Sequence, residues 1–276
     1  MICFPTCKIN LGLRITQKRA DGFHALETVF FPISIKDALE IIIEQDANAA
    51  PITFTSSGLA IHGNPSDNLC FKAYELFKKD YPTIPNIKMH LHKQIPMGAG
   101  LGGGSSDGAF TLVALNQLFD LQITEHKLMQ YALTLGSDCP FFILNKPAFA
   151  TGRGEILKLI HVNLDGYSIV IVNPGIAIST KMAFSVITPK VPDTNMEAII
   201  CESVTNWKDF LINDFEEPIF NSFPEIANIK QTLYQKGAVY ASMSGTGSTV
   251  YGIFPTSIID TLDFNFPAHY FVATAS

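Results

Sequence analysis

A turn rich in glycine and serine offers the clearest chemistry in this sequence. Between Ile95 and Asp107 it holds five glycines and two serines, directly ahead of an apolar segment with helical spacing. Residues without a Cβ let backbone N–H groups approach an anion closely, and the positive dipole end of a following helix attracts negative charge. The turn therefore predicts a polyphosphate site, in which Ser105 and Ser106 either cap the helix or turn their hydroxyls toward a phosphate or its metal ion.

Three other kinds of glycine loop fit the sequence less well. The Walker pattern requires a lysine after its last glycine, whereas Gly104 is followed by Ser105. The dinucleotide fingerprint requires an acid about 20 residues further on within a parallel βαβ unit, where this chain begins another helical segment. A protein kinase would carry a His-Arg-Asp triplet, which the sequence lacks. A helix entry that uses its glycines only for packing is the alternative without a ligand.

Lys8 and Asp138 are the candidate charged residues of the site. Lys8 interrupts an apolar strand pattern and shares a face with Asn10, two residues on, but alone it also fits an ordinary edge-strand lysine. Asp138 lies in a turn ahead of an apolar run, so its carboxylate is expected to be partly desolvated and to need a cation such as Lys8. The alternative is that Asp138 only forms the turn. Pro140 is expected to stop continuation of the helix that precedes this turn.

Two further turns carry polar or aromatic groups. Phe23 and His24 place a ring and an imidazole on one loop, which suits stacking against a base, although a lone histidine is more often structural. The segment 242–249 combines glycines with hydroxyl residues between two predicted strands. It fits either an ordinary hairpin or a second anion-binding turn that completes the site.

The elements that must position these groups follow from hydrophobic periodicity. Strands are expected over 3–15, 27–35, 39–44 and 87–92, with a helix over 68–81 capped by Asp67 and helices over 106–119 and 124–135. Strands over 148–153, 156–160 and 167–172, helices over 180–186 and 225–236, and strands over 238–243, 249–254 and 270–274 complete the pattern. The fold class is therefore α+β, and we expect two domains, residues 1–160 and 161–276.

Composition is typical of a compact globular enzyme. The 276 residues are 47% hydrophobic and 16% charged, which is enough for two modest cores. A net charge of -6 argues against a nucleic-acid partner, because no basic surplus can neutralise a phosphate backbone. Five cysteines without paired spacing predict neither a disulfide framework nor a zinc site. We expect a cytoplasmic location, with no signal peptide, no membrane partner and no obligate protein partner.

Five segments together resemble the GHMP kinase superfamily, in the same order along the chain. They are residues 8–11, 19–24, 96–106, 136–142 and 244–249. The resemblance implies an α+β fold with an N-terminal domain like the second domain of ribosomal protein S5 and a ferredoxin-like C-terminal domain. It also implies a kinase that uses ATP and Mg²⁺ to phosphorylate a small-molecule acceptor, a cytidine diphosphate sugar alcohol. The Mg²⁺ ligands are not indicated.

The resemblance also assigns roles to individual residues. Lys8 and Asp138 would form the catalytic pair. The ATP phosphates would be held by Pro96, Met97, Gly98, Ala99, Gly100, Leu101, Gly102, Gly103, Gly104, Ser105 and Ser106, while Asn64, Asn68 and Lys93 match positions near adenine. The acceptor would meet Asn10, Phe23, His24, Thr180 and Phe184. Phe23 stands where tyrosine is commoner, which keeps a stacking face and removes one hydroxyl. Ser137 and Cys139 also depart from the usual pattern, with an expected effect on packing alone.

Two other functions stay open at this point. Another small-alcohol kinase of the superfamily, such as a homoserine or mevalonate kinase, would share the glycine loop, although the aromatic loop at Phe23 and His24 argues against it. A nucleotide-binding sensor without turnover would use the glycine loop for capture alone, and the presence of both Lys8 and Asp138 argues against that. The sequence does not decide whether Asp138 abstracts the hydroxyl proton or only orients the hydroxyl.

Overall fold

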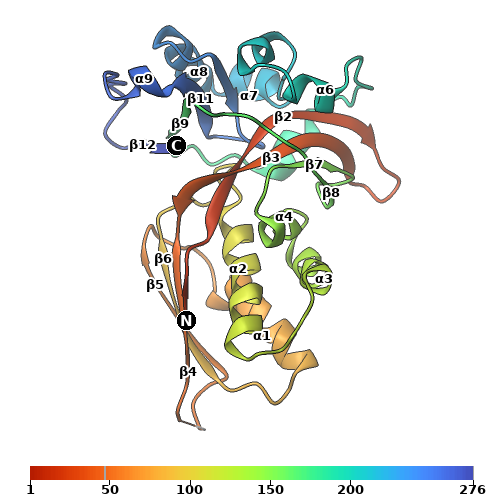
Figure 1. The fold of residues 1–276 in the computed structure, drawn as a ribbon, viewed down its shortest axis with the longest axis vertical. Helices are drawn as coiled ribbons and strands as arrows, with labels where there is room; N and C mark the ends of the chain where they lie inside the picture. Colours follow the sequence, from red (N-terminus) through yellow and green to blue (C-terminus); the bar gives the residue numbers. More distant parts are fainter. Residues whose placement is uncertain (47, 276) are drawn as a thin grey trace. The chain divides into compact units, whose positions relative to one another are not determined.

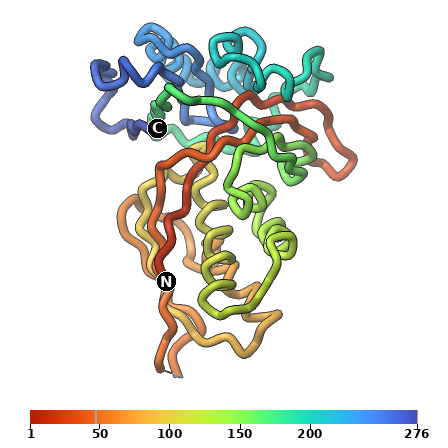
Figure 2. The backbone as a smooth tube through the Cα atoms, viewed as in Figure 1, coloured from red at the N-terminus to blue at the C-terminus, as the bar shows by residue number. Residues whose placement is uncertain are grey.

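The computed structural model describes residues 1–46 and 48–275 and divides the chain into two compact units. The first unit comprises residues 1–7, 35–97 and 102–146, and the second comprises residues 8–34, 98–101 and 147–276. The second unit thus includes residues from both sides of position 160, where the domain boundary is predicted. Figure 2 follows the chain by colour through these segments.

The first unit is built on a sheet with the strand order β1-β4-β6-β5. The strands are β1 (Ile2–Cys3), β4 (Ala38–Ile43), β5 (Ile52–Gly58) and β6 (Ile87–Lys93). β5 and β6 are parallel and are joined through the 3₁₀ turn η1 (Pro65–Asp67) and α1 (Leu69–Asp80), whereas the other neighbours are antiparallel. Alternate residues of β6 are buried, so one face of this strand contributes to the core.

Helices α1 to α4 complete the first unit, and α1 and α2 lie side by side along the sheet (Figure 1). The later helices are α2 (Gly103–Leu118), α3 (Glu125–Leu135) and α4 (Cys139–Leu144). The cap of α1 is Asn68, whose side-chain oxygen accepts the Cys70 N–H at 2.8 Å, and not Asp67 as predicted. The helix α3 ends at Leu135, so helical structure does not continue through residues 136–138, but Pro140 lies in the first turn of a further helix, α4, that the sequence analysis did not predict. A first-turn N–H has no intrahelical acceptor, and proline loses no hydrogen bond there.

The second unit contains two sheets. One has the order β2-β3-β7-β8, from β2 (Thr6–Lys18), β3 (His24–Lys36), β7 (Ala148–Thr151) and β8 (Ile156–Leu159). The first two residues of β2 and the last two of β3 belong to the first unit. The other has the order β10-β11-β9-β12, from β9 (Tyr167–Asn173), β10 (Tyr240–Met243), β11 (Val250–Pro255) and β12 (Phe271–Ala275).

The second of these sheets has ferredoxin-like topology, as predicted. Its neighbouring strands are all antiparallel, and the first strand in the chain, β9, lies between the third and the fourth. Between β9 and β10 come α5 (Thr180–Ser185), α6 (Met196–Ile200), η2 (Val204–Asp209), α7 (Glu216–Ser222) and α8 (Pro224–Gln235), and α9 (Thr256–Ile259) precedes β12. Among the described residues, no helix is long and apolar enough to cross a membrane.

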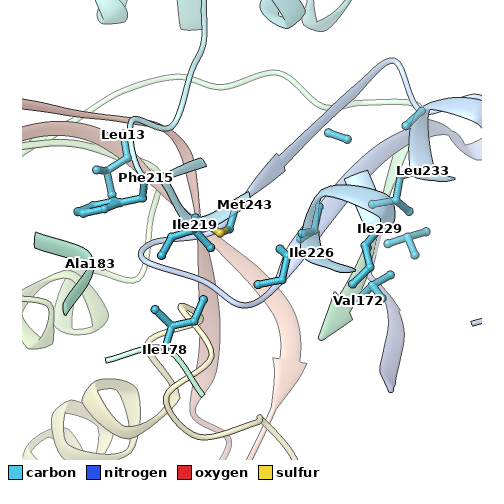
Figure 3. Packing of buried hydrophobic residues seen from close by; sticks show 14 of the residues in the cluster. Leu13, Val172, Ile178, Ala183, Phe215, Ile219, Ile226, Ile229, Leu233 and Met243 are labelled. Carbon is cyan, nitrogen blue, oxygen red and sulfur yellow. The ribbon is translucent and has the colours of Figure 1, made fainter. Parts of the chain in front are cut away.

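An apolar cluster joins β2 to the ferredoxin-like sheet within the second unit (Figure 3). Leu13 of β2 is buried in the same cluster as Val172 of β9 and Phe215. The helix α8 contributes Ile226, Ile229 and Leu233, whose spacing places them on one face. Burial of each large apolar side chain contributes about 1.5–3 kcal/mol, so this packing fixes the strand that carries Lys8.

Candidate active site

The glycine loop adopts left-handed backbone at alternate glycines. The φ angle is +62° at Gly98, +80° at Gly100 and +69° at Gly102. Gly102 is the N-cap of α2, so the helix begins three residues before the predicted start at position 106. Capping by Ser105 or Ser106 is therefore excluded, because both lie inside the first turn. The first N–H groups of this 16-residue helix have no intrahelical acceptors and form its positive end.

Within the second unit, the loop residues 98–101 are hydrogen-bonded to β2 and to the turn between β10 and β11. The Leu101 carbonyl accepts the backbone N–H of Lys8 at 2.9 Å, and the Gly100 carbonyl accepts the Ser244 hydroxyl at 2.7 Å. A Cβ on Gly100 would lie only 2.0 Å from the Ser244 carbonyl oxygen. The predicted hairpin between β10 and β11 is therefore present, and its turn also supports the glycine loop. Anion binding by this second turn stays a prediction.

Lys8 and Asn10 lie on one face of β2 and are both buried. Lys8 Nζ donates to Asn10 Oδ1 at 2.5 Å and lies 4.9 Å from the centroid of the Phe30 ring. Asn10 Nδ2 donates to Thr28 Oγ1 at 3.0 Å, and the Asn10 carbonyl accepts the Tyr251 hydroxyl at 2.8 Å. Because the Lys8 side chain is enclosed and fixed in this way, it is not an ordinary surface lysine of an edge strand.

Asn213 is a buried support for the turn that contacts Gly100. Its Nδ2 donates to the carbonyls of Met243 and Gly245 at 2.7 and 2.9 Å, and its Oδ1 accepts the Phe215 N–H at 3.0 Å. Asn213→Ala removes all three bonds and deprives these backbone groups of a buried partner.

We expect Asn213→Ala to lower the free energy of unfolding by about 2–4 kcal/mol, as measured by urea denaturation. Asn206→Ala is the matched control, because Asn206 is exposed and its side-chain amide donates to Glu202 at a longer distance of 3.3 Å. Its effect should stay within about 0.5 kcal/mol. Equal losses in the two variants would contradict the supporting role of Asn213.

Aromatic groups from distant segments meet in the second unit. The His24 ring stacks on Phe184 with centroids 5.1 Å apart and an interplanar angle of 27°. Thr180 begins α5 one turn before Phe184, and so lies on the same side of that helix. Phe23 is 54% exposed, and the Arg153 guanidinium lies 5.0 Å from its ring centroid. Contact between His24 and Phe184 thus brings together two segments predicted to meet the acceptor, Phe23–His24 and Thr180–Phe184. The ring of Phe23 stays accessible.

Asp138 is half buried and occupies the N-cap position of α4, in helical backbone. Its neighbour Cys139 is buried, and burial raises the pKa of the Cys139 thiol to about 12. The thiol therefore stays protonated at neutral pH and offers no nucleophile beside the carboxylate. This is consistent with a packing role for Cys139.

The three residues predicted to lie near adenine differ in exposure. Asn64 is exposed ahead of η1, and Asn68 is half buried with its side-chain oxygen engaged as the cap of α1. The Lys93 side chain has no exposed area and forms ion pairs with Asp37 and Asp107. Lys93 therefore presents no ammonium at the surface, and its two carboxylate partners are functional candidates that the sequence analysis missed.

Comparison with known proteins places this chain in a family. The models described as GHMP kinases N terminal domain and GHMP kinases C terminal match residues 68–146 and 197–263. A curated 4-diphosphocytidyl-2-C-methyl-D-erythritol kinase of Bacteroides thetaiotaomicron is 52% identical over 254 residues, which cover 92% of each chain. The chain belongs to the 4-diphosphocytidyl-2-C-methyl-D-erythritol kinase family. The same enzyme of Bacteroides fragilis is 49% identical over 265 residues, with 96% of each chain covered.

A solved structure extends this result to the fold. The crystal structure of a 4-(cytidine 5'-diphospho)-2C-methyl-D-erythritol kinase matches with a TM-score of 0.84 and 30% identity, and it covers 100% of this chain and 99% of the other. Membership of the 4-diphosphocytidyl-2-C-methyl-D-erythritol kinase family confirms the resemblance to the GHMP kinase superfamily and the two-domain α+β fold. The protein is a kinase, and ATP is its phosphoryl donor.

Proposed function

We infer that the protein phosphorylates the 2-hydroxyl of 4-diphosphocytidyl-2-C-methyl-D-erythritol with ATP, giving the 2-phosphate and ADP. This reaction belongs to the non-mevalonate route to isoprenoid precursors. The observation that carries the inference is 52% identity to a curated kinase of this name across 92% of the chain. We also propose a cytoplasmic location and no requirement for nucleic acid, a membrane or an obligate protein partner.

We propose that residues 96–106 hold the phosphates of ATP. The alternating left-handed glycines and the first amides of α2, which have no intrahelical acceptors, support this role, because backbone N–H groups in such conformations bind anions. Asn64 and Asn68 are proposed to lie near adenine.

We propose Mg²⁺ as the metal that accompanies ATP. The described residues hold no group of three or more His, Cys, Asp or Glu that could form a metal site, so the ion would depend on phosphate oxygens and few protein ligands. The Ser106 hydroxyl fits such a role, since it is fully enclosed and makes no hydrogen bond to any part of the chain that the structure describes. Ser105 is the other candidate in the same turn. Bound there, Mg²⁺ would neutralise charge on the phosphates.

We propose that Lys8 and Asp138 are the catalytic residues. Phosphoryl transfer needs mainly positioning and electrostatic stabilisation, and a buried lysine that is held by Asn10 supplies a fixed positive charge. A half-buried carboxylate at Asp138 can accept the proton of the acceptor hydroxyl, or orient that hydroxyl for attack. Family membership and the motifs around both residues support these roles.

We propose that the rings of Phe23, His24 and Phe184 bind the acceptor's cytosine, and that Asn10 and Thr180 also belong to the acceptor site. The stacked pair of His24 and Phe184 supports this, because a planar base adds readily to an existing stack. Phe23 offers its exposed ring to the same base.

His24→Ala should raise the KM for the acceptor about tenfold and leave the KM for ATP within about twofold, since base stacking contributes about 1–3 kcal/mol. Steady-state kinetics with each substrate varied in turn measures both constants. His126→Ala removes an exposed histidine of α3 that is not among the proposed site residues and should change neither constant. A variant of His24 that raised both KM values equally would remove this residue from the acceptor site.

The function itself is tested by ADP release. The purified protein is given ATP and Mg²⁺ with 4-diphosphocytidyl-2-C-methyl-D-erythritol, homoserine or mevalonate in parallel. We expect acceptor-dependent ADP only with the cytidine compound. A preference for homoserine or mevalonate would refute the inference, and saturable ATP binding without acceptor-dependent ADP would favour the sensor.

A further inference from the structure

A fully buried charged network lies in the first unit and has no part in the roles proposed above. Lys93 Nζ donates to Asp37 Oδ2 and, at 2.7 Å, to Asp107 Oδ2. All three side chains are at most 3% exposed. Two carboxylates thus face one ammonium in the core, where charges are costly to bury unless they are paired.

The network is bonded to the segment that enters the glycine loop. Asp37 Oδ1 accepts the backbone N–H groups of Gln94 and Ile95 at 2.6 and 2.9 Å, while Asp37 Oδ2 accepts from Lys93. One carboxylate therefore fixes three consecutive residues, 93–95, directly ahead of Pro96. These charge-assisted hydrogen bonds fix the chain where it leaves β6.

The same network contacts the segment that leaves the loop. Asp107 lies in α2 one turn beyond Gly103. A Cβ on Gly103 would lie 3.0 Å from Lys93 Nζ and 2.8 Å from the Ile95 side chain, so the start of α2 packs directly on the ammonium. Lys93 thereby links the entry at Ile95 to the exit at Gly103 and Asp107.

Stability alone is a weak explanation for these charges. Replacement of a buried ion pair by packed apolar groups is often neutral or stabilising, whereas the pair does define one geometry. Burial raises the pKa of Asp107 to about 7 against the opposing effect of Lys93, and Asp107 Oδ1 has no hydrogen-bond partner among residues 1–46 and 48–275. An energetically costly carboxylate is thus retained at the start of α2.

We propose that Asp37, Lys93 and Asp107 are positioning residues that hold the two ends of the glycine loop at the separation required for the phosphates of ATP. The proposal rests on the proposed function only in taking residues 96–106 as the phosphate-binding loop. In this role the three enclosed side chains act through the loop and not on the reacting atoms. Their loss should weaken ATP binding without an equal effect on the chemical step.

The test compares Asp107→Leu, Asp107→Asn and Thr111→Val. Leucine removes the link to Lys93, whereas asparagine keeps an oxygen that can accept from its ammonium. Thr111 is a buried polar residue one turn further along α2 that donates to the Asp107 carbonyl, so its valine variant disturbs the helix without breaking the network. Calorimetry measures the Kd of a non-hydrolysable ATP analogue with Mg²⁺, and kinetics measures kcat and both KM values.

For Asp107→Leu we expect the Kd and the KM for ATP to rise about tenfold or more, with kcat and the KM for the acceptor changed less than about threefold. Asp107→Asn should recover most of the affinity, and Thr111→Val should bind as the wild type does. Wild-type affinity in Asp107→Leu, or equal weakening in all three variants, would overturn the proposal. If Asp107→Leu does not fold, Lys93→Met/Asp107→Leu removes both charges, and wild-type affinity there would also overturn it. The calorimetric result is independent of the acceptor, so failure of the proposed function is seen separately, as absence of turnover in the wild type.

Discussion

Replacement of Gly100 by alanine is expected to lower kcat/KM for ATP by about 100-fold or more, because displacement of a phosphate-binding backbone by about 1 Å has effects of this size. The added Cβ would lie 2.0 Å from the Ser244 carbonyl oxygen, a backbone atom that cannot move aside by a rotamer change. Gly100 also has a φ angle of +80°, which residues with a Cβ rarely adopt.

The effect is expected on the nucleotide because the loop is closely held. The carbonyls of Gly100 and Leu101 each accept a hydrogen bond within the second unit, so relief of the clash must shift the segment that is proposed to bind the phosphates of ATP. Nucleotide Kd by calorimetry and initial rates at varied ATP measure this shift. The clash also predicts lower stability, which thermal denaturation records.

Gly166→Ala provides the control for backbone strain. Gly166 has the same φ angle of +80°, but a Cβ there would have no atom within 4 Å. It should cost about 1 kcal/mol of stability and leave ATP kinetics unchanged. A Gly100 variant with the kinetics of the Gly166 variant would show that contact with Ser244 does not position the loop.

Asp138→Asn is expected to lower kcat by about 10²–10⁴-fold if the carboxylate accepts the proton, the range typical of general base catalysis. The KM for ATP should change less than about threefold, since the proposed phosphate-binding residues 96–106 do not include Asp138. The pH-rate profile of this variant separates the two roles left open for Asp138. Loss of the acidic limb indicates proton abstraction, whereas a uniform decrease across pH indicates orientation of the hydroxyl.

Two companion variants complete this test. Asp120→Asn removes an exposed carboxylate and should retain wild-type turnover. Lys8→Met combined with Asp138→Asn should lose no more activity than the more damaged single variant, because residues that act as one unit are not additive. Near-normal turnover of Asp138→Asn at all pH values would exclude Asp138 from the chemistry. Additive losses would show that the two residues act separately.

The sequence could predict those features that local pattern determines. The alternation along β2 and β6, the helical spacing after the glycine loop and the apolar run of β9 all specify elements that the structure contains. The shared face of Lys8 and Asn10 follows from the strand period alone. The family motifs then supplied the fold, because their order along the chain matches that of the superfamily.

Features that depend on distant partners were missed. The strand β5 is mostly exposed and polar, and its parallel pairing with β6 gives it strand structure, so periodicity carried little signal. Lys93 did carry a signal, since it continues the buried series Ile87, Met89 and Leu91 on β6. That phase indicates a buried lysine that needs anions. Only the fold identifies Asp37 and Asp107 as those anions.

The hydroxyls of Ser244 and Tyr251 bind the backbone of residues 10 and 100, far earlier in the chain. A truncated protein that ends near position 160 would keep the glycine-rich motif but lose the hydroxyl groups that immobilise it. The motif therefore cannot be moved to another protein by itself. Chimaeras between homologues are therefore expected to recover nucleotide affinity only when Ser244 and Tyr251 come from the same parent as the backbone segments that they bind, at residues 100 and 10.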